Sequence, residues 1–225
     1  VDERNGSFAG KPLQFETFFA KAGLVYKGPR IGLDLSLSRK SRRNEDGFSP
    51  SSGEPVIRSD DDRDINTLQA TVAYGFHPDY KLFVTERAEQ NLYKKRIFEN
   101  GTFSGIKRDN LTLTTLAGLG VDVEGILSAN LGAGVTFRDY DESGIESTRN
   151  FAAEGEILWN ITPLTTGTLT LERAIVDSND VTKGVLDTRI GLAVDHEFRR
   201  NLVLGGFVET VLSDYSDDDR EDESL

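Results

Sequence analysis

The sequence has no cysteine, no methionine, a single tryptophan and two histidines among its 225 residues. Without cysteine it has no disulfides, thiolate metal sites or cysteine nucleophiles. Because methionine is missing even from the first position, we expect a processed protein or part of a longer one. No apolar run approaches the roughly 20 residues of a membrane-spanning helix, which excludes a helical membrane protein.

Positive charge is scarce as well. The 26 Lys and Arg residues are outnumbered by 38 Asp and Glu residues, giving a net charge of -12. A nucleic-acid-binding protein would carry a basic patch, so we expect no nucleic acid partner. The acidic runs Asp60–Asp62 and Asp217–Asp219 are interpreted as solvated loops. Divalent cation binding together with lipopolysaccharide phosphates is the alternative, although neither run has the pattern of an EF-hand loop.

The sequence instead shows long stretches in which apolar residues alternate with small or polar ones. The clearest is a hairpin from Leu111 to Phe137, each arm of which exceeds the usual strand length of about 5–6 residues. Its inward glycines, such as Gly118 and Gly132, are expected to leave room for another element. Similar alternation predicts ten strands, at about 13–26, 31–40, 64–76, from 80 onward, 111–121, 127–137, 151–160, 165–176, 184–197 and 202–213. The segments 92–98 and 103–108, which flank an Asn100-Gly101 turn, are predicted to extend two of these strands as a polar ribbon.

The connections between these strands alternate in length. Those near residues 28, 78, 124, 163 and 199 are short, whereas those near 50, 100, 144 and 180 are longer and more polar. Outer-membrane barrels have this asymmetry, and the strands are long enough to cross a bilayer. Aromatic residues gather at both levels and resemble two interfacial girdles: Tyr26, Phe76, Tyr80, Trp159 and Phe198 near the short turns, and Phe137, Tyr140, Phe151 and Tyr215 near the long loops. We therefore predict an all-β, antiparallel up-and-down transmembrane β-barrel in a single domain, 1–225, rather than a soluble barrel or sandwich with the same alternation.

The predicted barrel assigns a role to each face. The candidate lumen-lining residues are Asp34, Gln69, Asn110, Asn130, Arg138, Glu154, Glu156, Glu172, Asp187, Arg189, Asp195 and Glu209. The candidate lipid-facing or girdle residues are Phe76, Leu113, Leu119, Leu131, Val135, Phe137, Trp159 and Leu192. The expected partners are outer-membrane lipid, lipopolysaccharide and small solutes. We expect no cofactor, metal site or catalytic group.

Residues from about 108 to 223 resemble the putative beta-barrel porin 2 family of proteobacterial outer-membrane proteins. The resemblance rests on Leu158–Thr165, Leu169–Arg173, Arg189–Leu202 and Arg220–Asp222, which are strand and turn patterns without chemistry. It implies an outer-membrane barrel with more strands than this chain supplies, and no catalytic residues. Both ends of the predicted sheet fall on the long-loop side, so we expect a fragment lacking at least one strand at each end.

Three functions are compatible with such a barrel. The first is a porin-like passive channel for small solutes that favours cations, because the inward face carries carboxylates. The second is a non-conducting envelope or surface-polysaccharide export component, in which pairs such as Asp187 and Arg189 bridge a blocked lumen. The third is a barrel enzyme, which the placement of His77 and His196 at short turns disfavours.

Overall fold

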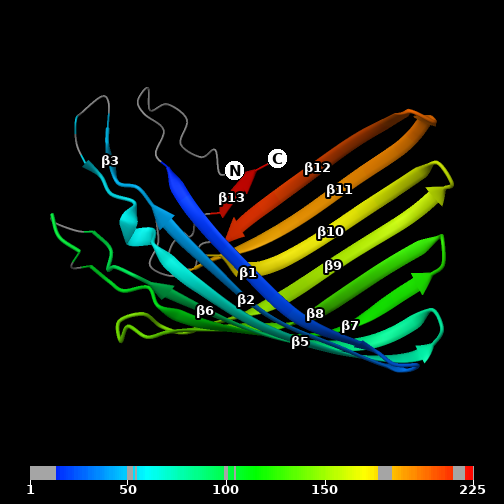
Figure 1. Cartoon of the computed structure of the whole chain (residues 1–225), viewed down its shortest axis with the longest axis horizontal. Coiled ribbons are helices and arrows are strands. Elements are labelled where there is room, and N and C mark those ends of the chain that lie inside the picture. Colours follow the sequence, from blue (N-terminus) through cyan, green and yellow to red (C-terminus); the bar gives the residue numbers. More distant parts are fainter. Residues whose placement is uncertain are drawn as a thin grey trace.

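The computed structural model describes residues 14–49, 53, 55–98, 101–103, 105–176 and 184–214, and the backbone of 221–224. Its main feature is an 11-stranded antiparallel sheet in which neighbouring strands follow chain order (Figure 1). Ten strands of 12 to 15 residues form almost all of it: β1 (Phe15–Lys27), β2 (Ile31–Asn44), β5 (Arg63–His77), β6 (Tyr80–Tyr93), β7 (Asn110–Val123), β8 (Leu127–Tyr140), β9 (Thr148–Thr162), β10 (Thr165–Val176), β11 (Val185–Arg199) and β12 (Leu202–Asp214). The predicted all-β, antiparallel fold of about ten strands is confirmed.

Short elements complete the described chain. β13 (Glu221–Ser224) pairs with the last four residues of β12, and β3 (Gly47–Phe48) pairs with β4 (Pro55–Val56) in a separate ribbon. A 3-10 turn, η1 (Ser59–Asp61), precedes β5. Within the described residues, no helix has the length and apolar character needed to cross a bilayer.

The sheet is strongly curved but not closed. In Figure 1, β1 crosses the view from the long-loop end at the upper left to the short-turn end at the lower right, whereas β12 begins at the upper right and runs down towards the centre. Over the described ranges, β1 pairs only with β2, and β12 pairs with β11 and, at one end, with β13. A curved sheet has one concave and one convex face, and the alternation of residues along each strand places different side chains on the two faces.

Most of the large aliphatic residues in the middle strands face away from the concave side, whereas edge strands β1 and β12 also carry apolar residues such as Phe19 and Phe207 on it. Successive side chains of a strand point to opposite faces, and the register aligns equivalent residues across the sheet. On the convex face the side chains of Phe76, Leu113, Leu119, Leu131, Val135, Phe137, Trp159 and Leu192 are 40 to 54% exposed. A sheet folded for water would bury such a row, so the exposed apolar surface favours a lipid-facing side.

Several strand ends differ from the sequence prediction. β2 continues to Asn44, and β6 continues through its charged half to Tyr93. The predicted ribbon around Asn100-Gly101 is much reduced. Its described part shows two backbone hydrogen bonds, from Gly105 N to Ile97 O and from Ile97 N to Ile106 O, and no extended strand; Asn100 lies outside the described residues.

One residue of the aromatic girdle predicted near the long loops, Tyr140, lies on the concave face instead of the convex face. Tyr140 follows Arg138 on the concave side of β8 and is only 8% exposed. Its hydroxyl accepts a hydrogen bond from the Gly184 N–H at 2.8 Å. The prediction therefore placed Tyr140 at the correct end of its strand but on the wrong face of the sheet. Tyr215, from the same girdle, and the acidic run 217–219 lie outside the described residues.

Candidate functional site

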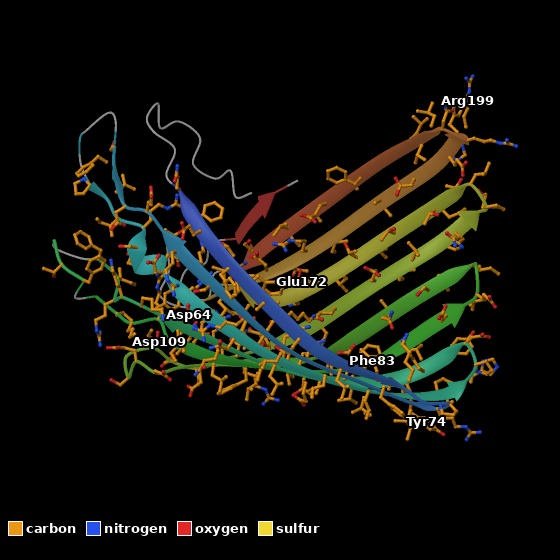
Figure 2. All side chains as sticks on the ribbon, in the orientation of Figure 1. Asp64, Tyr74, Phe83, Asp109, Glu172 and Arg199 are labelled. Carbon is orange, nitrogen blue, oxygen red and sulfur yellow. The ribbon has the colours of Figure 1, made fainter. Side chains whose placement is uncertain are left out.

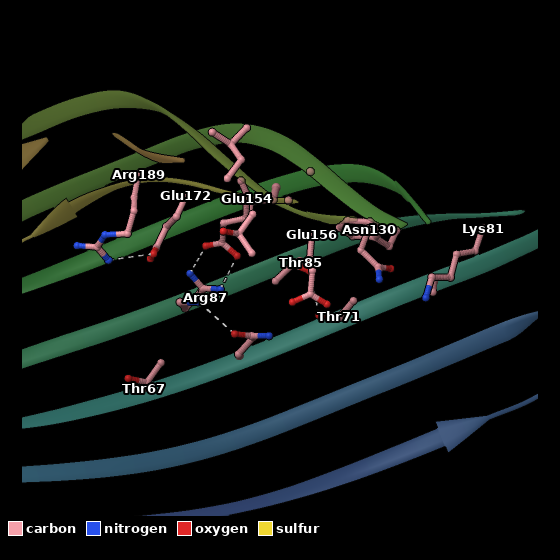
Figure 3. A pocket seen from close by; sticks show the side chains of 18 of the residues that line it. Thr67, Thr71, Lys81, Thr85, Arg87, Asn130, Glu154, Glu156, Glu172 and Arg189 are labelled. Carbon is pink, nitrogen blue, oxygen red and sulfur yellow. Dashed lines mark hydrogen bonds and ion pairs between the residues drawn. The ribbon is translucent and has the colours of Figure 1, made fainter. Parts of the chain in front are cut away.

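A polar cavity of about 720 Å³ occupies the concave face over β5 to β11 (Figure 3). Charged groups in its lining come from β6, β9, β10 and β11: Lys81, Arg87, Glu89, Glu154, Glu156, Glu172 and Arg189. Threonines and small residues fill much of the remainder, among them Thr67, Thr71, Thr85 and Gly132. Figure 3 shows several of these side chains pointing into the same space from different strands.

Two glycines form a low floor beneath this cavity. A Cβ added to Gly118 of β7 would lie 2.3 Å from the Phe83 ring and 2.3 Å from the Leu131 carbonyl oxygen. One added to Gly132 of β8 would lie 3.3 Å from the same ring. The Phe83 side chain, from β6, therefore lies across the two neighbouring strands. The expectation that inward glycines leave room for another element is met by a side chain of the same sheet.

An ion pair also spans the concave face. Arg87 of β6 donates from Nη2 to Glu154 Oε2 of β9 at 2.9 Å, and from Nη1 to the other carboxylate oxygen. Its Nε donates to Gln69 Oε1 of β5 at 3.1 Å. The guanidinium therefore connects strands on both sides of β6, and its bond to Glu154 passes over β7 and β8 (Figure 3). Such a bidentate ion pair fixes both side chains in one orientation.

A second cation, Arg189 of β11, lies among three carboxylates. Its nitrogens are 3.5 Å from Glu172, 3.8 Å from Asp187 and 3.9 Å from Glu209. Glu156, also in the cavity, makes no ion pair within the described part of the chain. The β9 to β12 side of the cavity therefore carries more negative than positive charge.

The concave face as a whole separates its charges by strand. The register places basic residues mainly on β1 to β6: Lys21, Lys40, Arg42, Lys81 and Arg87, with Asp34 and Glu89 among them. It places carboxylates mainly on β9 to β12: Glu154, Glu156, Glu172, Asp187, Asp195 and Glu209, with Arg189 among them. A curved wall brings these two sets to opposite sides of the same space, so the electrostatic potential varies across it.

The structure distributes the twelve predicted lumen residues over three settings. Lining the cavity are Gln69, Asn130, Glu154, Glu156, Glu172 and Arg189. On the same face but outside the cavity are Asp34, Asp187, Asp195 and Glu209. Asn110 and Arg138 share this face but are only 3% and 2% exposed, so they present no polar group to open space. Arg138 Nε donates to Thr112 Oγ1 at 2.8 Å and its Nη2 donates to the Ile175 carbonyl. Its role is therefore structural, because it links β8 to β7 and β10.

Five cavity residues of β6 are absent from the predicted lumen residues. They occupy every second position of the strand, in the same phase as the rest of the concave face: Lys81, Phe83, Thr85, Arg87 and Glu89. The strand was predicted from 80 onward without an end point, and none of its residues was assigned to the lumen. Extending the period of two through the charged run from Glu86 to Glu89 would have placed Arg87 inward and Glu86 outward.

The features considered for other chemistry are dispersed. His77 accepts the Asp79 N–H at the β5–β6 turn, and His196 contacts Thr165 Oγ1 at 2.9 Å on the short-turn side. The acids around η1 bind separate partners, for example Asp62 with the Asn44 N–H and Asp60 with the Phe98 N–H. Across the described ranges, no group of three or more histidine, aspartate or glutamate side chains is arranged to hold a metal ion.

The family model described as Putative beta-barrel porin 2 matches residues 2–225, which is almost the whole chain. The chain belongs to this family. The resemblance carried by about 108–223 is confirmed, and the match includes β1 to β6, where the resemblance was looser. Membership in a β-barrel porin family indicates a membrane location and agrees with the exposed apolar convex face. None of the curated proteins compared with the chain matches it.

Proposed function

We propose that this porin-family sheet forms part of the wall of a passive outer-membrane channel for small polar solutes, and that it is not an enzyme. The observation that carries the proposal is the polar cavity of about 720 Å³ on the concave face, opposite an exposed aliphatic convex face. Lipid on one side and water on the other would satisfy both faces. The unequal loop lengths support an orientation with the long connections on the cell surface and the short turns in the periplasm.

The channel is proposed to favour cations modestly. The cavity lining carries Glu89, Glu154, Glu156 and Glu172 against Lys81, Arg87 and Arg189, and the whole chain has a net charge of -12. A negative potential inside a low-dielectric wall concentrates cations. Because basic residues also lie on the β1 to β6 side, the preference should be small and not a strict exclusion of anions.

Single-channel recording on the complete protein that contains this chain tests the proposal. In planar bilayers with unequal KCl on the two sides, we expect stepwise conductance and a reversal potential on the cation-selective side. A protein that inserts, resists proteolysis and yet conducts nothing would refute the channel. A reversal potential on the anion-selective side would refute the ion preference alone.

The alternative of a non-conducting barrel receives less support from side-chain geometry. Asp187 and Arg189, the pair suggested to bridge a blocked lumen, lie two residues apart on β11 with 3.8 Å between their charged atoms. The Arg87–Glu154 pair links β6 to β9 over two strands, but the cavity of about 720 Å³ that both residues line remains beside it.

A further inference from the structure

The convex face of β2 changes character abruptly along the strand. Alternate residues Ile31, Leu33, Leu35 and Leu37 are exposed aliphatic side chains, and the next residues on the same face are Arg39, Ser41 and Arg43. The short-turn end of the strand is therefore apolar outside, and the long-loop end is cationic outside. In a membrane-spanning wall this change marks the level at which β2 leaves the hydrocarbon.

One buried carboxylate gathers the cations at this level. Asp64, at the long-loop end of β5 (Figure 2), has a side chain that is 3% exposed. It accepts hydrogen bonds from Arg39 Nη2 at 3.0 Å, Arg43 Nη2 at 2.7 Å and Ser41 Oγ at 2.6 Å. The Lys94 Nζ lies 2.6 Å from the same carboxylate. Three cations therefore share one anion, and the hydrogen-bonded group keeps an excess of positive charge.

The cations remain accessible although they are held in place. The side chains of Arg39, Arg43 and Lys94 are 59%, 39% and 46% exposed. Arg43 is further fixed by donating from Nη1 to the Arg63 carbonyl at 3.0 Å. Glu16 lies opposite Arg43 in the β1–β2 register and makes no ion pair with it in the described structure. In a chain of net charge -12, this accessible positive cluster is a local exception.

We propose that the cluster of Arg39, Arg43 and Lys94 binds the phosphate groups of a phosphorylated glycolipid of the outer leaflet, of the lipid A type. Phosphate offers several charged acceptor oxygens, which suit guanidinium forks and an ammonium group. The exposed Leu35 and Leu37 directly below provide a surface for the acyl chains of the same molecule. That apolar surface favours a lipid over free phosphate as the ligand. The proposal rests on the outer-membrane location proposed above.

Lipid binding by the complete protein, measured by native mass spectrometry from detergent micelles, tests this inference. The probes are lipid A with two phosphates, the same lipid with one phosphate, and inorganic phosphate as competitor. The triple variant Arg39→Gln, Arg43→Gln, Lys94→Gln is compared with a control, Lys21→Gln, Lys40→Gln, Arg42→Gln, which removes the same charge from the concave face of β1 and β2. Because the triple variant leaves Asp64 buried without its cations, the single variant Arg39→Gln is measured as well.

We expect wild type and control to bind the two-phosphate lipid at least about tenfold more tightly than the triple variant, and Arg39→Gln to lose roughly threefold to tenfold. We also expect the one-phosphate lipid to bind more weakly than the two-phosphate lipid, and millimolar phosphate to displace neither. Equal binding by wild type and Arg39→Gln, or an equal loss in the control, would overturn the site. Displacement of the lipid by free phosphate would overturn the assignment to lipid. Conductance recorded on the same preparations separates this outcome from failure of the proposed channel.

Discussion

The Arg87–Glu154 pair provides the sharpest test of the proposed channel, because it places opposite charges in one cavity. Replacing Arg87 with Gln removes the cation and leaves Glu154, Glu156 and Glu172 near the same space. Replacing Glu154 with Gln removes an anion and leaves the guanidinium. Glu154→Gln keeps the size of the side chain, whereas Arg87→Gln shortens it and leaves an amide with two N–H donors in place of five. We expect Arg87→Gln to increase the preference for cations and Glu154→Gln to decrease it.

The size of the effect follows from the cavity dimensions. A cavity of 720 Å³ has a radius of about 6 Å if treated as a sphere, so an ion at its centre lies about that far from the altered charge. In water this separation gives about 0.7 kcal/mol, and screening at 0.1 M salt reduces it to about 0.4 kcal/mol. Because cation and anion respond with opposite sign, the permeability ratio should change by about threefold to fourfold for each substitution.

The measurement is the reversal potential of single channels of the complete protein in a KCl gradient near 0.1 M. Glu156→Gln serves as the matched control, because Glu156 lines the same cavity and makes no ion pair in the described structure. It should decrease the cation preference about as much as Glu154→Gln, with less loss of stability. Unchanged ratios in all three variants would mean that ions do not pass over this face. A shift towards anions in Arg87→Gln would contradict the reasoning directly.

Three further predictions concern stability. Gly118→Ala should lower the free energy of unfolding by about 1–3 kcal/mol in a urea titration, because the new Cβ would meet the Phe83 ring and the Leu131 carbonyl oxygen. The control is Gly206→Ala, which should leave the free energy of unfolding nearly unchanged because no atom lies within 4 Å of the new Cβ. Arg138→Gln should lower the free energy of unfolding by about 2–4 kcal/mol in the same titration, because the buried guanidinium and its bonds to Thr112 and Ile175 are lost. An unchanged free energy of unfolding would show that Arg138 has no structural role. For Asp46, burial raises the pKa, but the Arg58 and Ser59 N–H groups and the Ser59 hydroxyl outweigh it and hold the pKa below its usual value. The carboxylate therefore stabilises the folded state fully above about pH 4 and progressively less as the pH falls further, so Asp46→Asn should speed proteolysis near Asp46 at pH 7, by a margin that shrinks below pH 4.

Most of the wall could be predicted from the sequence because one physical rule determines it. A period of two assigns each residue to a face, and a slip by one residue would turn every aliphatic side chain towards the concave side. The strands 111–121 and 127–137 were therefore placed within three residues of their observed ends in β7 and β8. The rule fails where length or chemistry changes locally. The charged half of β6 received no predicted end or lumen residues, and Tyr140 was assigned by its position near the long loops, not by the alternation.

The contacts on the concave face could not be derived from alternation. Alternation places Arg87 and Glu154 on the same side, but it does not bring together residues that are 67 positions apart and separated by two strands. That contact depends on the curvature of the sheet, which brings β6 and β9 within reach of each other's side chains. Likewise, the sequence shows Asn110 and Arg138 as inward polar residues, whereas three-dimensional packing buries them.

Glu86 and Arg87 show how a charged pair of neighbours can serve both faces of one strand. Arg87 turns inward to Glu154, while Glu86 turns outward and accepts the Thr115 hydroxyl at 2.8 and 2.9 Å. Its neighbours in the register, Ala70 and Thr115, belong to the convex rows that end in Phe76 and Val121. A carboxylate on a lipid-facing row is costly away from the interface, and one hydroxyl offsets only part of that cost. Glu86 therefore interrupts the aliphatic belt on β6, the same strand whose concave side carries Lys81, Phe83 and Arg87.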